Sequence, residues 1–118
     1  METNKNEIVT KAETLSALEL VKSMQGAQVA IVPISMRGHK IHDGMKFHVS
    51  LADYNKFLNS QQTGKISPTA AGKEFLMHTV DPEDAQLLEE ILKVVGTIDT
   101  ILPEVTNQIS PNMQEALD

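Results

Sequence analysis

Apolar residues recur at helical spacing in five segments of this chain, and short polar breaks separate the segments. The most regular stripe lies in the C-terminal half, where apolar residues occupy positions i, i+3, i+4 and i+7: Leu88, Ile91, Leu92 and Val95. Spacing of this kind places side chains on one face of an amphipathic helix. The pattern predicts helices over about 11–25, 51–59, 68–80, 82–95 and 98–109.

Polar start signals precede several of these predicted helices. Ser50 and Asp53 have the spacing of a capping box, in which each side chain satisfies a free backbone donor of the first turn. Pro68 follows Ser67 and takes the first helical position, where the missing N–H of proline costs nothing. Pro103 lies inside the last segment, which is therefore either one bent helix or two short helices.

Between the first two predicted helices the helical period gives way to strand patterns. Residues over about 27–35 are rich in β-branched side chains and predict one strand. Met45, Phe47 and Val49 then alternate with polar residues and predict a second, half-buried strand over about 45–50. Two strands this close in sequence favour an antiparallel ribbon.

The turn of this ribbon is expected at His42, Asp43 and Gly44. A three-residue loop with glycine in the left-handed position sets Ile41 opposite Met45, which pairs apolar with apolar. A two-residue turn at Asp43 and Gly44 would set His42 opposite Met45 instead. The sequence therefore predicts an α+β fold, in which a small antiparallel ribbon of two to three strands packs with four to five helices.

Length and composition limit both the architecture and the function. A chain of 118 residues supports one domain, 1–118, and residues 1–9 and 110–118 read as flexible tails. The formal net charge of −6 argues against nucleic acid as a partner. No cysteine, no secretory signal and no bilayer-spanning apolar run is present in the sequence, which favours a cytoplasmic protein and no membrane partner.

Candidate chemistry is sparse. His39, His42 and His48 lie near the predicted turn, but their spacing matches no established metal motif. Glu83 and Asp84 belong to a first helical turn, where negative charge stabilises the helix dipole, so a catalytic role is not favoured. The sequence thus predicts a protein that is not an enzyme and needs no cofactor.

The apolar stripes themselves point to a partner. Five helices and a ribbon leave a chain of 118 residues with too little interior to cover every stripe, so some apolar area is expected to meet another protein. A second copy of the chain is one such partner. The residues expected to bind partners share the C-terminal stripes: Leu88, Ile91, Leu92, Val95, Ile98, Ile101 and Leu102.

Several ordered motifs resemble a known family. They are the run Val49 to Asn59, which contains Asp-Tyr-Asn-Lys, the spacer Lys65 to Pro68, the block Phe75 to Pro82, and the acidic and apolar helix Ala85 to Leu92. Together these motifs, over roughly 38–95, resemble the tail assembly chaperones of contractile-tailed bacteriophages and prophages. The chain departs from the family by carrying about 35 additional N-terminal residues, so the resemblance does not extend to oligomeric state or partner geometry.

The resemblance implies a non-enzymatic role in the cytoplasm of the host bacterium. Such chaperones bind the long tape measure protein and help tail-tube protein to polymerise around it. An acidic surface that contains methionine suits reversible binding of apolar client helices. An alternative from another class is a small regulatory or ligand-binding domain whose histidines bind a metal or respond to pH.

Overall fold

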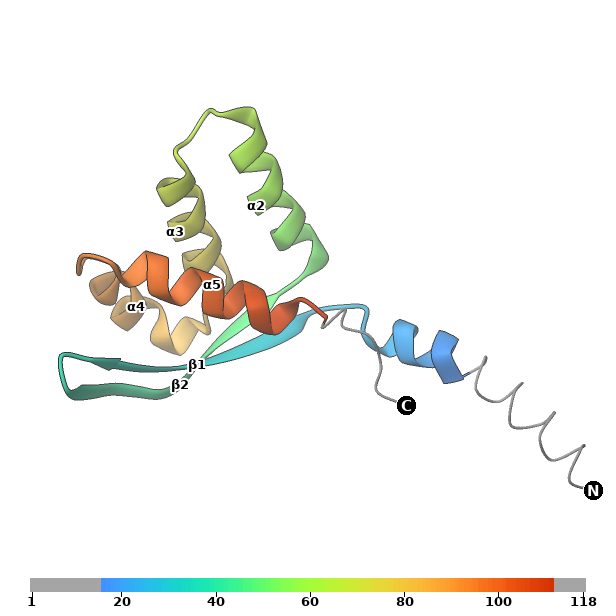
Figure 1. The fold of residues 1–118 in the computed structure, drawn as a ribbon, viewed down its shortest axis with the longest axis horizontal. Coiled ribbons are helices and arrows are strands. Elements are labelled where there is room, and N and C mark those ends of the chain that lie inside the picture. Colours follow the sequence, from blue (N-terminus) through green and yellow to red (C-terminus); the bar gives the residue numbers. More distant parts are fainter. Residues whose placement is uncertain (1–15, 112–118) are drawn as a thin grey trace, which may run out of the picture.

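The computed structural model describes residues 16–111 and has an α+β architecture, as the sequence predicts (Figure 1). Residues 16–23 are helical, and residues 1–15 and 112–118 lie outside the described part. The remaining elements follow in the order β1 (Gln28–Met36), β2 (His39–Val49), α2 (Leu51–Thr63), α3 (Pro68–Thr79), the short 3-10 helix η1 (Pro82–Asp84), α4 (Ala85–Ile91) and α5 (Thr97–Ile109).

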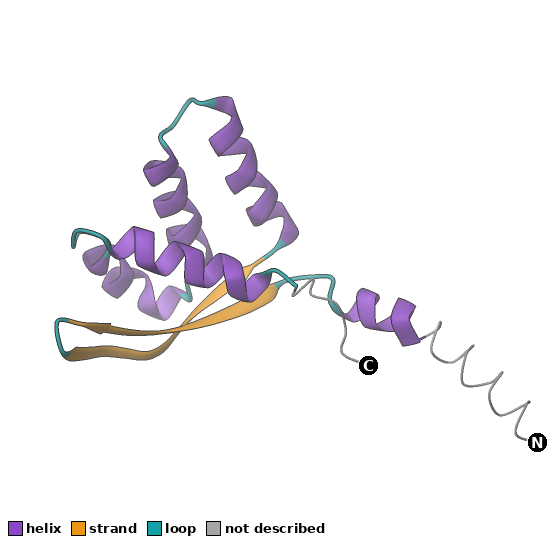
Figure 2. Ribbon diagram, viewed as in Figure 1, coloured by secondary structure: helices purple, strands orange, loops and turns teal. Residues whose placement is uncertain are grey.

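The two strands form an antiparallel ribbon with one buried face. Gln28 pairs with Val49 and Ala30 with Phe47, so alternate residues of both strands point to the same side. The helices cover that side alone (Figure 2). Side chains of both strands and four helical segments make the core: Ala30, Val32, Ile34, Met45, Phe47, Val49, Phe57, Ala71, Phe75, Leu76, Val80, Leu88, Ile91, Leu92, Ile101 and Val105.

The hairpin turn lies at Arg37 and Gly38, so the expected loop at residues 42–44 is wrong. Arg37 has a φ of 51° and Gly38 a φ of 83°, and two positive φ angles are the requirement of a type I′ turn. Residues 42–44 instead lie within β2, where the register shifts because Val32 pairs with Met45 but Ile34 pairs with His42. Glycine at position 44 marks this irregularity in the strand and not the turn.

This turn offers a stabilising substitution. Arginine at a left-handed position strains its Cβ against the backbone, whereas asparagine tolerates that conformation. Arg37→Asn is expected to raise the free energy of unfolding by about 0.5–1 kcal/mol, which corresponds to a few degrees in thermal melting. Arg37→Ala is the control, because it removes the same charge without relieving the strain. Equal melting temperatures for the two variants would contradict this account.

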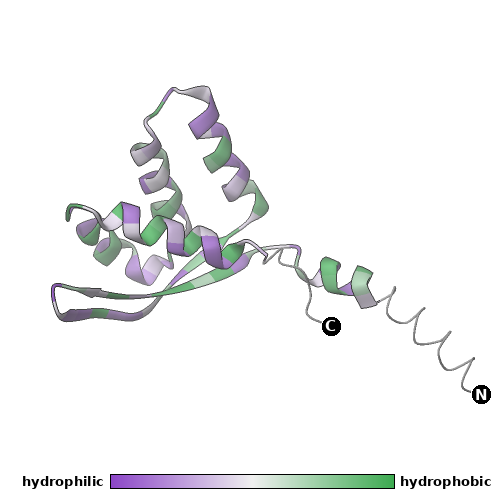
Figure 3. Ribbon diagram, viewed as in Figure 1, coloured by the Kyte–Doolittle hydropathy of each residue, from purple (hydrophilic) through white to green (hydrophobic). Residues whose placement is uncertain are grey.

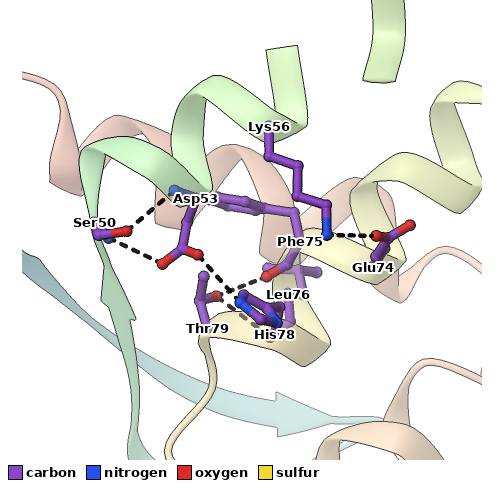
Figure 4. A network of polar contacts seen from close by, with 8 residues as sticks. All are labelled: Ser50, Asp53, Lys56, Glu74, Phe75, Leu76, His78 and Thr79. Atoms are coloured by element: carbon purple, nitrogen blue, oxygen red, sulfur yellow. Dashed lines mark hydrogen bonds and ion pairs between the residues drawn. The ribbon is translucent and has the colours of Figure 1, made fainter. Parts of the chain in front are cut away.

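Helices α2 and α3 are joined by polar contacts (Figure 4) and by the stacking of two aromatic rings. The predicted capping box is confirmed, since Asp53 N–H donates to Ser50 Oγ at 3.1 Å and Ser50 N–H donates to Asp53 Oδ2 at 3.2 Å. The rings of Phe57 and Phe75 stack with centroids 4.7 Å apart. Across the same joint Lys56 Nζ lies 3.4 Å from a Glu74 carboxylate oxygen.

The helix boundaries match the prediction where local caps set them. Helix α3 begins after Ser67 as expected, and α5 is one helix with Pro103 inside it, not two short ones. Helix α2 runs four residues beyond the expected 59 and ends at Thr63, with Gly64 as its C-cap. The helix expected over 82–95 is shorter, because η1 occupies its start and α4 ends at Ile91.

Candidate functional site

The predicted partner-binding residues do not form one exposed face. Leu88, Ile91, Leu92 and Ile101 are core residues, which corrects the expectation that this stripe presents them to a partner. Ile98 and Leu102 are half-buried against the core. Only Val95 is fully available, with an exposed fraction of 99%. The stripe is thus mostly the inner face of the fold, and its exposed end is a single valine.

Val95 is exposed because α4 stops early. Thr97 Oγ1 donates to the carbonyl oxygens of Ile91 at 2.9 Å and Val94 at 2.8 Å, which satisfies acceptors that a longer helix would use internally. Gly96 follows with a φ of 88°, a conformation that glycine adopts without strain and that turns the chain into α5. Val95 therefore lies in a tight connection and not on a helix face.

An open groove of about 420 Å³ lies beside this connection. The second half of β1 forms one wall, and the α4–α5 connection with the first half of α5 forms the other. We call it the tip groove, because it adjoins the hairpin turn. Its lining is Val32, Pro33, Ile34, Ser35, Met36, Arg37, Ile91, Val94, Val95, Gly96, Thr97, Thr100, Ile101 and Glu104. Arg37 and Glu104 are its two charged residues.

The outer edge of β1 is closed to a further strand near its middle. Ile31 N–H donates to Gln108 Oε1 at 2.8 Å, and Gln108 Nε2 donates to the Ile31 carbonyl oxygen at 2.8 Å. The amide of α5 thus takes the place of a neighbouring strand. Two residues further along, Pro33 has no N–H to offer. A partner is therefore not expected to add a strand along β1.

The edge of β2 is closed by a similar device. Asp81 N–H donates to the Lys46 carbonyl oxygen at 2.9 Å, and Val80 forms an isolated antiparallel bridge with Phe47. Backbone donors and acceptors at the middle of both edges are thus occupied. Addition of a partner strand at either edge is therefore disfavoured, whereas the tip groove remains open to a partner that binds without strand pairing.

A second groove of about 410 Å³ lies at the opposite end of β1 and α5, and sequence reasoning missed it. We call it the base groove. Leu51, at the start of α2, is 69% exposed beside it. None of its lining residues carries a charge: Met24, Gln25, Gly26, Gln28, Val49, Ser50, Leu51, Tyr54, Ile109, Ser110 and Pro111. The sequence offered one signal for this groove: Leu51 directly follows the Ser50 cap, and the first residue of a helix is usually exposed to solvent.

Three of the four histidines, His42, His48 and His78, lie beside aspartates and not beside one another. His42 Nε2 lies 3.1 Å from Asp84 Oδ1, and His48 Nε2 lies 3.7 Å from Asp81 Oδ2. Gly44 N–H donates to His42 Nδ1 at 2.9 Å, which places the proton of a neutral His42 on the nitrogen facing Asp84. Within residues 16–111, no three histidine or carboxylate side chains gather closely enough to hold a metal ion.

Folding lowers the pKa of the Asp53 carboxylate below its ordinary value. Desolvation raises the pKa of Asp53, but hydrogen bonds from the backbone and hydroxyl of Ser50, with the charges of His78 and Lys56, outweigh it. His78 Nε2 lies 3.2 Å from Asp53 Oδ1. These contacts stabilise the ionised carboxylate in the folded state.

The stability of the protein is therefore expected to fall in acid. Because folding lowers the pKa of Asp53 below its ordinary 3.8, its stabilising contribution is complete well above that pH and is lost as the pH falls through the lowered value. At neutral pH Asp53→Asn is expected to reduce the free energy of unfolding by about 1 kcal/mol, as loss of a cap does. Urea unfolding at pH 7 and pH 2 checks this prediction. A deficit of equal size at both pH values would contradict it.

Comparisons with known proteins add no further identification. Across residues 16–111 no helix combines the length and apolar character needed to cross a membrane. No protein-family model matches the chain, and neither the curated proteins nor the solved structures include a significant match.

Proposed function

We propose that this chain is a non-enzymatic tail assembly chaperone of a contractile-tailed phage or prophage, acting in the cytoplasm of the host bacterium. Its client is an apolar helical segment of the tape measure protein, which binds in the tip groove and is kept soluble while tail-tube protein assembles around it. The motifs over roughly 38–95 support the family, and the tip groove supports the mode of binding.

One observation carries the proposal of a binding surface. An apolar groove of about 420 Å³ stays open beside a valine that is 99% exposed. Covering an apolar side chain with this exposure removes its surface from water, which favours binding of a partner. The groove has a size in the range of protein sites that hold apolar groups.

A helix fits the tip groove better than a strand. The β1 edge that borders the groove is occupied at Ile31 by Gln108 and interrupted by Pro33, so it offers no continuous ladder. A helix needs no backbone partner and binds by inserting side chains at i, i+3, i+4 and i+7. Arg37 and Glu104 line the groove as well and are of opposite charge, so they can orient a client helix whose ends differ in charge.

Val95→Asp is expected to weaken binding of a tape measure fragment at least about tenfold, because a carboxylate replaces the apolar contact at the groove. Val29→Asp is the matched control. Val29 is 48% exposed on the open face of the ribbon and lines neither groove, so the same change in chemistry should leave client affinity unchanged. Calorimetric titration of both variants, with circular dichroism to verify folding, gives the comparison. Equal affinity of Val95→Asp and the wild type would remove the tip groove from the account.

A further inference from the structure

The helix at residues 16–23 presents apolar side chains that nothing in the described chain covers. Leu18, Leu20, Val21 and Met24 are 52%, 57%, 55% and 57% exposed. Figure 1 shows this helix beyond the end of the ribbon and apart from α2 to α5, and Figure 3 shows several hydrophobic positions along it. Exposed apolar side chains gathered on one short helix mark an interaction surface.

The base groove is the complementary surface. It is open, apolar and without a charged lining residue, and Leu51 and Tyr54 of α2 line it together with Ile109 of α5. We propose that the 16–23 helix of one copy of this chain docks in the base groove of a second copy, and that the second copy's helix docks reciprocally in the first. The resulting dimer is symmetric, with two identical helix-in-groove contacts.

The connection between helix and groove favours a second copy over the same chain. Only Gln25, Gly26 and Ala27 separate Met24 from the start of β1, and Met24, Gln25 and Gly26 themselves line the groove. A helix that must reverse within three residues cannot lie over a groove whose wall those residues form. Short connections of this kind favour domain swapping, in which each copy places its helix on the other copy.

Charge also favours this contact. Each copy carries a formal net charge of −6, so two copies repel one another over most of their surfaces. The base groove has no charged lining residue, and Glu19 and Lys22 on the helix are of opposite sign. Contact through these surfaces therefore adds little repulsion between the two acidic copies, because the groove that receives each helix has no charged lining residue. The tip groove lies at the other end of α5 and stays free for a client.

Sedimentation velocity over a wide concentration range tests the proposal with the full chain. The wild type is expected to dimerise, and Val21→Asp on the helix or Leu51→Asp in the groove is expected to raise the dimer Kd at least about tenfold. Both positions are more than half exposed, and Leu51 is in a first helical turn where a carboxylate suits the dipole, so both variants should fold. Val29→Asp is the control and should dimerise as the wild type does.

A mixture gives the sharper result. A heterodimer of Val21→Asp with Leu51→Asp retains one contact between an intact helix and an intact groove, so it should form at concentrations at which neither variant dimerises alone. A Gly-Ser insert after Gly26 should shift the wild type toward monomer, since the lengthened connection lets each helix reach its own groove. A wild type that stays monomeric, whether or not its base groove binds an apolar helical peptide, or a mixture without heterodimer would overturn the proposal. None of these results tests client binding at Val95, which the Val95→Asp titration tests separately.

Discussion

Leu88→Asp is expected to remove most of the stability of the fold, with a loss of at least about 4 kcal/mol in the free energy of unfolding. Leu88 is 0% exposed and belongs to the core beneath the ribbon, so the substitution removes its apolar contacts and leaves a carboxylate without a partner in the interior. Domains of this size have about 5–15 kcal/mol of stability in total. Urea unfolding followed by circular dichroism measures the loss.

Val95→Asp, on the same predicted stripe, is the contrasting variant. Its side chain is 99% exposed, so the free energy of unfolding should change by no more than about 0.5 kcal/mol. The pair separates residues that hold the fold together from the residue that is available to a client. Similar losses in the two variants would show that the connection after α4 packs more closely than described.

Phe47→Ala is expected to cost about 3–5 kcal/mol, the typical loss for a buried aromatic residue. Phe47 is 0% exposed, pairs with Ala30 across the ribbon and forms the bridge to Val80. Its ring therefore lies where the ribbon, the end of α3 and the helices meet. The cavity left by the ring would stay empty, because Ala30, the residue opposite on β1, has a side chain too short to fill it.

Lys46→Ala is the control for Phe47→Ala. The Lys46 side chain is exposed on the open face, and its carbonyl contact with Asp81 uses the backbone, which the substitution retains. Thermal melting should shift little for Lys46→Ala and by more than ten degrees for Phe47→Ala, given about 4–8 °C per kcal/mol in small domains. Comparable shifts at the two positions would contradict the assignment of the inner and outer faces.

Local signals allowed most of the fold to be predicted. The starts of α2 and α3 follow from Ser50 and Ser67, whose hydroxyls accept from backbone donors within the same few residues. Alternation of Met45 and Phe47 with polar neighbours identified the inner face of β2 because strand side chains alternate by geometry. Such features depend on residues close in sequence and need no knowledge of the tertiary structure.

The hairpin turn and the exposed surfaces could not be predicted in the same way. Asp43-Gly44 is the better turn sequence by composition, yet the ribbon turns at Arg37-Gly38, because the pairing of β1 with β2 and the helices over one face fix the register. The predicted docking stripe failed for a related reason. A helical stripe shows which side chains share a face, but not whether that face meets the core or solvent.

By itself, the sequence determined the α+β class, the starts of α2 and α3, the alternation of the strands and the acidic charge of the chain. These properties follow from propensity, capping and composition, which act over a few residues. Only the tertiary structure decided that the C-terminal stripe is interior, that Gln108 closes the edge of β1, and that no part of residues 16–111 covers the 16–23 helix or the base groove. Burial is a property of elements packed together, and residues 31 and 108 meet only when α5 lies along β1.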